Sequence, residues 1–207
     1  MNAISEGAPV VSQILTEYDF IVVLDKSGSM GETDMPGGRS RWDYMKETAT
    51  AFARDLAKID SDGLGLVLFS GSSIVSEDGV GIDRIKEVLD KNNPSGSTPL
   101  AEALEAALKL AGKSDKKDFI IVFTDGVPDD RAAAAKIIVD ASHKQDTDDA
   151  LTILFVQVGK DAAATKYLQD LDDNLKDAKF DIVDAKTIAE AEKFTSVAAL
   201  VEHAIND

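Results

Sequence analysis

The chain has 207 residues, of which 44% are hydrophobic. It contains 22 Lys and Arg and 38 Asp and Glu, which gives a net charge of −16. This composition supports a substantial core and argues against a disordered chain. The negative charge makes nucleic acid and anionic membrane surfaces poor partners. The lack of cysteine excludes disulfides and thiolate chemistry. The start MNAISEGAPVVSQ does not resemble a secretory signal, and no apolar run approaches the ~20 residues that span a bilayer. We therefore expect a cytoplasmic protein without membrane insertion.

Short apolar runs alternate with amphipathic patterns along the chain. Residues 1–16 are expected to be an N-terminal arm, and residues 17–207 one domain. The runs read as buried strands and the patterns as helices packed on a sheet. In chain order, we predict a strand at Phe20–Leu24, a helix over 45–59, strands at Leu64–Phe69 and Ser73–Val75, helices over 82–89 and 100–111, a strand at Phe119–Phe123, a helix over 134–141, a strand at Leu151–Val158, a helix over 164–175, a short strand at Phe180–Val183 and a helix over 197–204.

This alternation predicts an α/β fold, a doubly wound and mostly parallel central sheet flanked by helices. Ligand sites in such folds lie at the carboxyl ends of the strands. The residues that follow the predicted strands are therefore the first candidates for function.

Small oxygen-bearing side chains occupy these positions. Carboxylates and hydroxyls are hard donors that suit Mg²⁺, Mn²⁺ or Ca²⁺ better than zinc, and two carboxylates would match the charge of a divalent ion. For the threonine in this set, which is followed by a proline and a helix, a helix-capping role is the alternative. The candidates are Asp25, Ser27 and Ser29 after the first strand, Thr98 in the loop before the helix over 100–111, and Asp125 after the strand at Phe119–Phe123.

The same residues resemble the von Willebrand factor type A domain family, from about Tyr18 to the end of the chain. Asp25-Lys-Ser-Gly-Ser29 is similar to the D-x-S-x-S motif of that family, Thr98 to its separate threonine, and Asp125 in Phe-Thr-Asp-Gly to its later aspartate. One D-x-S-x-S is a weak signal, but the three motifs occur in the family's order. The resemblance implies a Rossmann-like fold and a metal-ion-dependent adhesion site.

The resemblance also implies a function and partners. Ser27, Ser29 and Thr98 would be direct ligands, and Asp25 and Asp125 would bind the ion directly or through water. The position left open would take a Glu or Asp of a protein partner, so we expect a binding module and not an enzyme. Mg²⁺ is the expected ion, with Mn²⁺ or Ca²⁺ as alternatives. Compact bacterial intracellular members, which this chain resembles, commonly work beside AAA+ ATPases, chelatases or stress-resistance systems.

Two other functions remain open at this point. A Mg²⁺-dependent phosphoryl-transfer enzyme or a receiver-like domain also has an aspartate at a strand end, but the former needs a second aspartate where Ser27 stands, and the latter leaves Ser27 and Ser29 unexplained. No phosphate-binding glycine loop follows a strand, and His143 and His203 fall on predicted helices. Alternatively, the domain binds its partner by a metal-independent surface.

Several residues near the candidate site have competing interpretations. Glu32 and Asp34 could add ligands or shield the site, although a solvated acidic loop is favoured. Asp129 and Asp130 are interpreted as acids in the first turn of a helix, where they complement the helix dipole. Trp42 is equally consistent with an interface anchor and with packing over a helix start.

Overall fold

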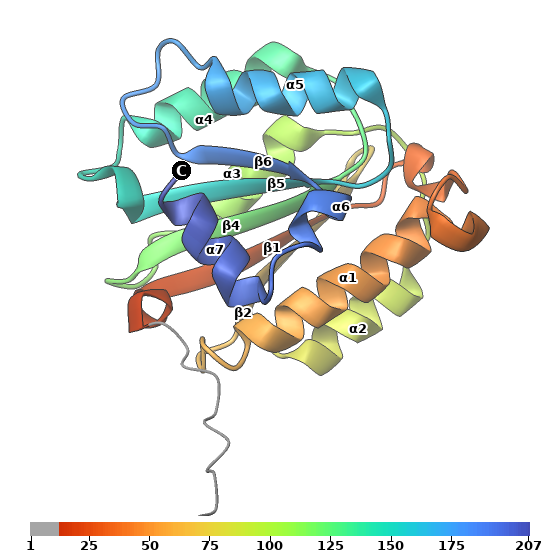
Figure 1. Ribbon diagram of the computed structural model, residues 1–207, viewed down its shortest axis with the longest axis horizontal. Coiled ribbons are helices and arrows are strands. Elements are labelled where there is room, and N and C mark those ends of the chain that lie inside the picture. The colour runs from red at the N-terminus through yellow and green to blue at the C-terminus, as the bar shows by residue number, and fades with distance from the viewer. Residues whose placement is uncertain (1–12) are drawn as a thin grey trace, which may run out of the picture.

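Six strands form a single sheet with the order β3-β2-β1-β4-β5-β6 in a computed structural model that describes residues 13–207 (Figure 1). Every neighbouring pair is parallel except β2 and β3, which are antiparallel and joined by a turn at Gly71. The strands are β1 (Tyr18–Asp25), β2 (Leu64–Ser70), β3 (Ser73–Val80), β4 (Lys117–Thr124), β5 (Leu151–Gln157) and β6 (Val183–Thr187).

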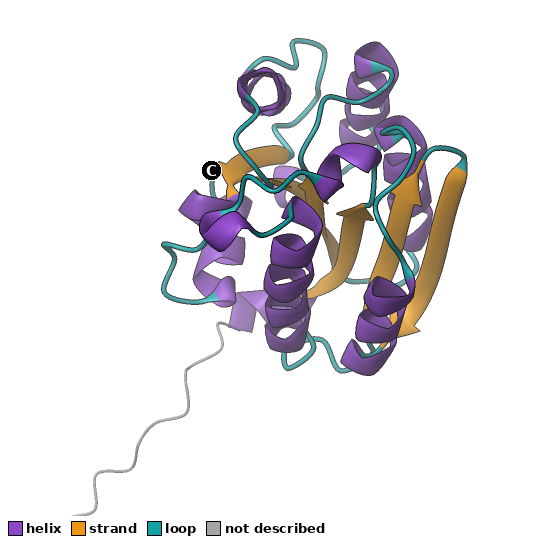
Figure 2. Ribbon diagram, turned by 90° about the vertical axis from the view of Figure 1, so that its right-hand side faces the viewer, coloured by secondary structure: helices purple, strands orange, loops and turns teal. Residues whose placement is uncertain are grey.

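Helices cover both faces of the sheet (Figure 2). One layer holds α1, α2 and α7, and the other holds α3, α4 and α5. The helices are α1 (Arg41–Leu56), α2 (Ile82–Lys91), α3 (Leu100–Leu110), α4 (Arg131–Ser142), α5 (Ala162–Asp173), α6 (Ile188–Ala191) and α7 (Val197–Ile205). None of the helices within residues 13–207 is long and apolar enough to cross a bilayer.

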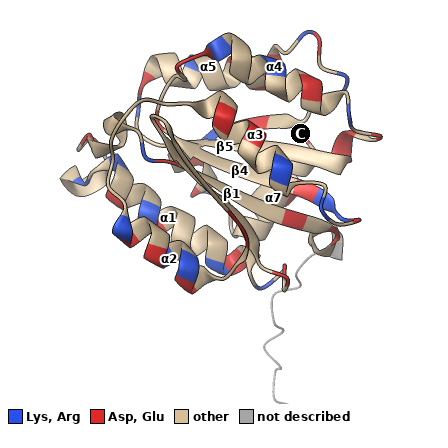
Figure 3. Ribbon diagram, turned by 180° about the vertical axis from the view of Figure 1, so that it is seen from behind, with Lys and Arg blue, Asp and Glu red and all other residues tan. Residues whose placement is uncertain are grey.

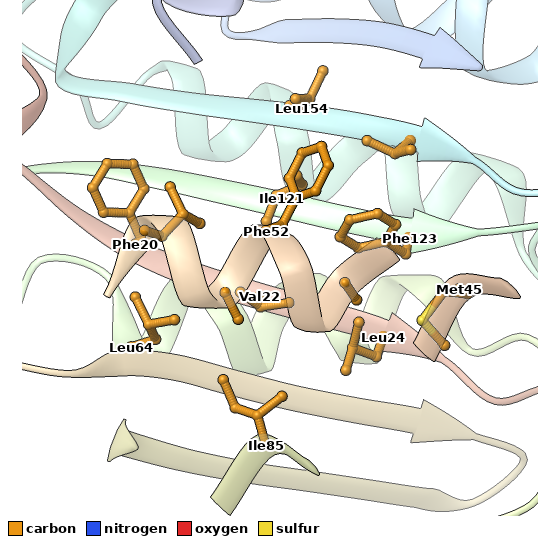
Figure 4. Packing of buried hydrophobic residues seen from close by; sticks show 14 of the residues in the cluster. Phe20, Val22, Leu24, Met45, Phe52, Leu64, Ile85, Ile121, Phe123 and Leu154 are labelled. Carbon is orange, nitrogen blue, oxygen red and sulfur yellow. The ribbon is translucent and has the colours of Figure 1, made fainter. Parts of the chain in front are cut away.

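Strand β1 is apolar on both sides because each side faces a helical layer. Phe20, Val22 and Leu24 point toward α1 (Figure 4), whereas Ile21 and Val23 belong to the core beneath α3. Side chains alternate between the two faces of a strand, so a strand between two layers must be apolar at every position. The doubly wound, mostly parallel α/β fold predicted from this pattern is confirmed.

The end of the chain differs from the prediction. The strand expected at Phe180–Val183 begins only at Val183 and continues to Thr187, and the short helix α6 follows it. Within residues 13–207 this strand pairs only with β5, at the edge of the sheet. It carries Asp184 and Lys186, so its sequence is not a continuous apolar run. Most of the expected arm lies outside the described residues, but Leu15, in a 3-10 helix before β1, is fully buried.

The strand order places a switch point between β1 and β4. The chain leaves β1 toward β2 on one side, whereas β4 and β5 extend the sheet on the other. Loops diverge above such a point and leave room for a ligand at the carboxyl ends of the strands. Three loops gather there, after β1, before α3 and after β4, because hydrogen bonds tie them to one another.

Candidate metal centre

The carboxylate of Asp25 ends β1 and is completely buried. One oxygen accepts the Ser27 backbone N–H at 2.7 Å, and the other accepts the Thr124 hydroxyl at 2.7 Å. These bonds fix the carboxylate between the first and third loops. Each carboxylate oxygen has a further lone pair, so the group retains acceptor capacity.

Ser27, Ser29 and Asp125 form a continuous hydrogen-bonded chain. A 3-10 turn over Gly28–Gly31 folds the loop after β1, and the Ser27 and Ser29 hydroxyl oxygens lie 3.2 Å apart. The Ser29 hydroxyl then donates to Asp125 at 2.9 Å. Asp125 is 1% exposed and Ser29 is partly exposed, so the chain runs from the interior to the surface.

Backbone hydrogen bonds bring the loop of Thr98 to the same place. The Gly28 N–H donates to the Gly96 carbonyl at 2.9 Å, and the positive φ of 79° at Gly96 suits glycine. A Cβ added to Gly126 would lie 3.9 Å from both the Ser29 and the Thr98 hydroxyl oxygens, so these hydroxyls flank one small space. All five residues selected from the sequence are thus gathered at one end of the sheet.

Thr98 does not cap α3. The cap position is Pro99, and no side chain among the described residues bonds the first turn of this helix. Asp129 instead holds the Thr98 backbone, since it accepts the Thr98 N–H at 3.1 Å and its own N–H donates to the Thr98 carbonyl at 3.0 Å. The first-turn interpretation of Asp129 is therefore wrong. Asp130 is the residue that caps α4, through the Ala133 N–H at 2.9 Å.

Arg41 is a member of the site that the sequence analysis missed. Its guanidinium, 7% exposed, donates to Asp125 at 2.8 Å and makes two bonds of 3.0 and 2.7 Å to Asp34. Glu32 pairs with it at 2.8 Å. Both acids stay exposed, as the favoured interpretation of a solvated acidic loop expects, and both are also anchored to the buried guanidinium. Gly159, at φ 84°, leaves room for this side chain, because a Cβ there would lie 2.5 Å from the Arg41 Nε.

Burial controls the electrostatics of the two carboxylates. It raises the pKa of Asp25 to about 7, although the hydrogen bonds from Thr124 and Ser27 oppose the shift, and the charge of Asp125 adds to it. Burial also raises the pKa of Asp125, against the lowering effects of Arg41 and Ser29. Burying two like charges together is unfavourable unless a cation compensates them.

The family resemblance implies a divalent cation, and the donor set fits one. Every side chain of the set offers oxygen, with two carboxylates and three hydroxyls, as a hard ion requires. The single charge of Arg41 is more than balanced by Asp34 and Glu32. Arg41 therefore compensates only part of the charge of the surrounding carboxylates, and an ion would neutralise the remainder.

The remaining aromatic and histidine candidates lie outside the site. Trp42, the second residue of α1, is 3% exposed and packs in the hydrophobic core. The interface-anchor interpretation is therefore wrong. His143 is exposed at the end of α4, where its ring bonds the Asp177 carbonyl, and His203 is exposed beside the Phe194 ring. Both histidines are surface residues, as predicted.

Solved structures with a similar fold include adhesion and pilus proteins. A point mutant of the PilB minor pilin from Streptococcus sanguinis matches 91% of this chain at a TM-score of 0.65 and 16% identity. Manganese-loaded TRAP protein from Plasmodium vivax matches 85% at 0.58 and 17%, and the pilus adhesin SpaC from Lactobacillus rhamnosus GG matches 92% at 0.61 and 18%. The chain spans 60%, 71% and 30% of those proteins, respectively.

Sequence comparison identifies the family. No curated protein matches the chain. The sequence profile of the von Willebrand factor type A domain matches residues 20–127, which are 108 of the 207 residues and include all five candidate ligands. At identities of 16–18%, the structural neighbours support only the fold, and they agree with this assignment. The chain belongs to the von Willebrand factor type A domain family.

Proposed function

We propose that this domain is a protein-binding module whose binding depends on a divalent cation held by Asp25, Ser27, Ser29, Thr98 and Asp125. The observation that carries the proposal is the convergence of these oxygen-bearing side chains from three separate loops at the switch point of the sheet. Mg²⁺ is the expected ion, and Mn²⁺ and Ca²⁺ meet the same donor requirements.

The chain's own residues prepare the site for an acidic ligand. Thr124 and the Ser27 N–H orient Asp25, while Arg41 and Ser29 orient Asp125, so both carboxylates are held before a ligand arrives. Ser29 is partly exposed, so the set of oxygen donors reaches the surface, where a partner can contact it. The bound cation would supply positive charge at a surface that is negative overall, and this local reversal would let a partner's Glu or Asp bind.

A catalytic role has less support. The position two residues after Asp25, where a phosphoryl-transfer enzyme of this layout needs an acid, is Ser27, and its hydroxyl lies 3.2 Å from the Ser29 hydroxyl. A metal-independent binding surface is the remaining alternative, and metal dependence separates it from our proposal. Cooperation with an AAA+ ATPase or a stress-resistance system, a bacterial origin and a cytoplasmic location stay predictions.

Calorimetric titration with Mg²⁺ and Mn²⁺ tests the metal centre. Metal-stripped wild type should bind one ion, and Asp25→Ala should abolish binding while the protein stays folded. Asp146→Ala, which removes the same charge from an exposed position outside the site, is the matched control and should bind like wild type. Absence of binding in the wild type, even with acetate present to fill the open position, would exclude this centre.

Partner capture tests the function itself. We expect the wild type to retain a partner in Mg²⁺ and to release it into chelator, and the partner to be lost with Thr98→Ala but kept with Thr98→Ser, which preserves the hydroxyl. Because Thr98 makes no cap bond to α3, the alanine variant should remain as stable as wild type within about 1 kcal/mol. A partner retained equally in chelator would favour the metal-independent surface.

A further inference from the structure

Three aspartates from distant parts of the chain meet away from the candidate metal centre. Asp172 lies near the end of α5, Asp184 near the start of β6, and Asp207 follows α7. One carboxylate oxygen from each lies within 4.8 Å of those of the other two. The candidate metal centre occupies the carboxyl ends of the strands, whereas Asp184 is the second residue of its strand, so the two groups are separate.

Asp184 carries an oxygen that lacks a partner. Its side chain is fully buried, and its Oδ2 makes no hydrogen bond with any of the described residues. Its Oδ1 pairs with the ammonium of Lys186. Leaving a buried carboxylate oxygen without a donor is unfavourable, because its hydration is lost and nothing replaces it. A cation bound to the Asp184 Oδ2 would accept one of its lone pairs and remove this penalty.

The charge around this oxygen is not balanced. Three carboxylates face one ammonium, that of Lys186, which leaves two negative charges. Asp172 already accepts the Ala185 N–H at 3.1 Å, which fixes its direction. The excess charge equals that of one divalent cation.

We propose that Asp172, Asp184 and Asp207 bind a divalent cation of the Ca²⁺ type. The donors are carboxylate oxygens, and the described part of the chain places no histidine in the group, so zinc is disfavoured. The three oxygens lie within 4.8 Å of one another, and Ca²⁺–oxygen distances of about 2.3–2.6 Å allow separations up to about 4.6–5.2 Å across the ion, so the group can hold Ca²⁺ without rearrangement.

Such an ion would add the end of the chain to α5 and β6, which the Ala185 N–H and Asp172 already connect. Asp207 is exposed and follows the last helix, whereas Asp184 is fixed in the sheet. Binding would hold the end of α7 against α5 and the edge strand β6. We therefore expect Ca²⁺ to slow backbone hydrogen exchange at the end of α7, an effect that metal binding at Asp25 does not produce directly.

The test uses the Asp25→Ala protein, so that the centre proposed above is absent. Calorimetric titration with Ca²⁺ should detect one site in this protein, and Asp207→Asn or Asp184→Asn added to it should weaken the affinity at least about tenfold. Asp207 is exposed, so its replacement should leave folding intact even if the change at Asp184 does not. Asp177→Asn, an exposed neutralisation in the loop between α5 and β6, is the matched control and should change nothing.

Two outcomes would overturn this inference. Absence of Ca²⁺ binding in the Asp25→Ala protein would mean that a proton, not a metal ion, satisfies the buried oxygen of Asp184. Binding that survives both Asp207→Asn and Asp184→Asn would place the ion elsewhere. Neither result bears on the proposed adhesion site, because that site is tested by Mg²⁺ binding in the wild type.

Discussion

Arg41 sets the charge balance of the candidate metal centre. Its guanidinium bridges the buried Asp125 and the more exposed Asp34 and Glu32, so it links a candidate ligand to the loop after β1. Two nitrogens of the guanidinium donate to the two carboxylate oxygens of Asp34, and lysine cannot reproduce this bidentate, charge-assisted contact. Arg41 therefore compensates part of the negative charge before any cation binds.

Arg41→Gln should make the apo protein less stable and more responsive to metal. Removing one partner of a buried ion pair lowers the free energy of unfolding by about 3–5 kcal/mol. Because Asp34 and Glu32 are exposed to solvent, we expect a loss near the lower end of this range. Saturating Mg²⁺ should stabilise this variant more than wild type, because in the variant the ion alone compensates the charge of Asp125. Urea unfolding with and without Mg²⁺ measures both effects. Equal stabilisation of variant and wild type would show that Arg41 and the ion do not share Asp125.

The second residue of strand β4, Asp118, carries a buried carboxylate that opposes folding at neutral pH. Asp118 is 9% exposed and accepts the Gly112 N–H at 2.8 Å just beyond α3. Burial, with a contribution from the charge of Asp19, raises the pKa of Asp118 to about 6 from 3.8. The folded state therefore holds this proton more tightly than the unfolded state, and the contribution of Asp118 to stability is lost as the pH rises toward 6.

Asp118→Asn should become more stable relative to wild type as the pH increases from 4 to 7. The asparagine oxygen can still accept the Gly112 N–H, so the comparison isolates the ionisation. Between pH 4 and 7, the free energy of unfolding of Asp118→Asn relative to wild type should increase by on the order of 1 kcal/mol, a value reduced for screening by solvent. Urea unfolding of both proteins at each pH measures this difference. A difference that does not vary with pH would show that the Asp118 pKa is close to its ordinary value in the folded protein.

The elements that the sequence predicted well are those whose two faces are both buried. Strands β1, β2, β4 and β5 are continuous apolar runs, and a run of this kind specifies a strand between two helical layers. Edge strand β6 was misplaced because Asp184 and Lys186 interrupt its apolar pattern. Helix α6 is one turn long, which is too short for its periodicity to be visible.

The five candidate ligands could be selected from the sequence because each follows a predictable element and carries a distinctive side chain. Arg41 could not, because Arg39 lies only two positions before it and no local pattern distinguishes the buried arginine from the partly exposed one. Asp129 was interpreted as a first-turn acid for a similar reason. Its bonds to Thr98 connect loops 31 residues apart, and sequence spacing does not encode such contacts.

At the scale of the whole molecule, negative charge is widely distributed. Acidic residues lie on both helical layers and in several loops (Figure 3), in keeping with the net charge of −16. Net charge of this size favours solubility but opposes compaction through self-repulsion. A cation that binds only the folded protein would offset part of this repulsion.

Metal should therefore raise the stability of the entire domain by mass action. At a free Mg²⁺ concentration of about 100 times its dissociation constant, the free energy of unfolding should increase by about 2.7 kcal/mol. Asp25→Ala should show no such increase. Chemical denaturation at several Mg²⁺ concentrations measures the effect, and a gain of equal size in the Asp25→Ala protein would assign it to cation binding outside the candidate centre.

The contact between the ends of β1 and β4 also has a consequence for how the protein folds. Asp25 and Thr124 are hydrogen-bonded across 99 positions of the chain, and the parallel pairing of their strands requires a long crossover. Contacts that join remote segments form slowly, because the entropy of closing the intervening loop is lost before the pairing is gained. The cation-binding loops meet only when those strands have paired. An ion should therefore leave the refolding rate nearly unchanged and act on the domain by slowing its unfolding.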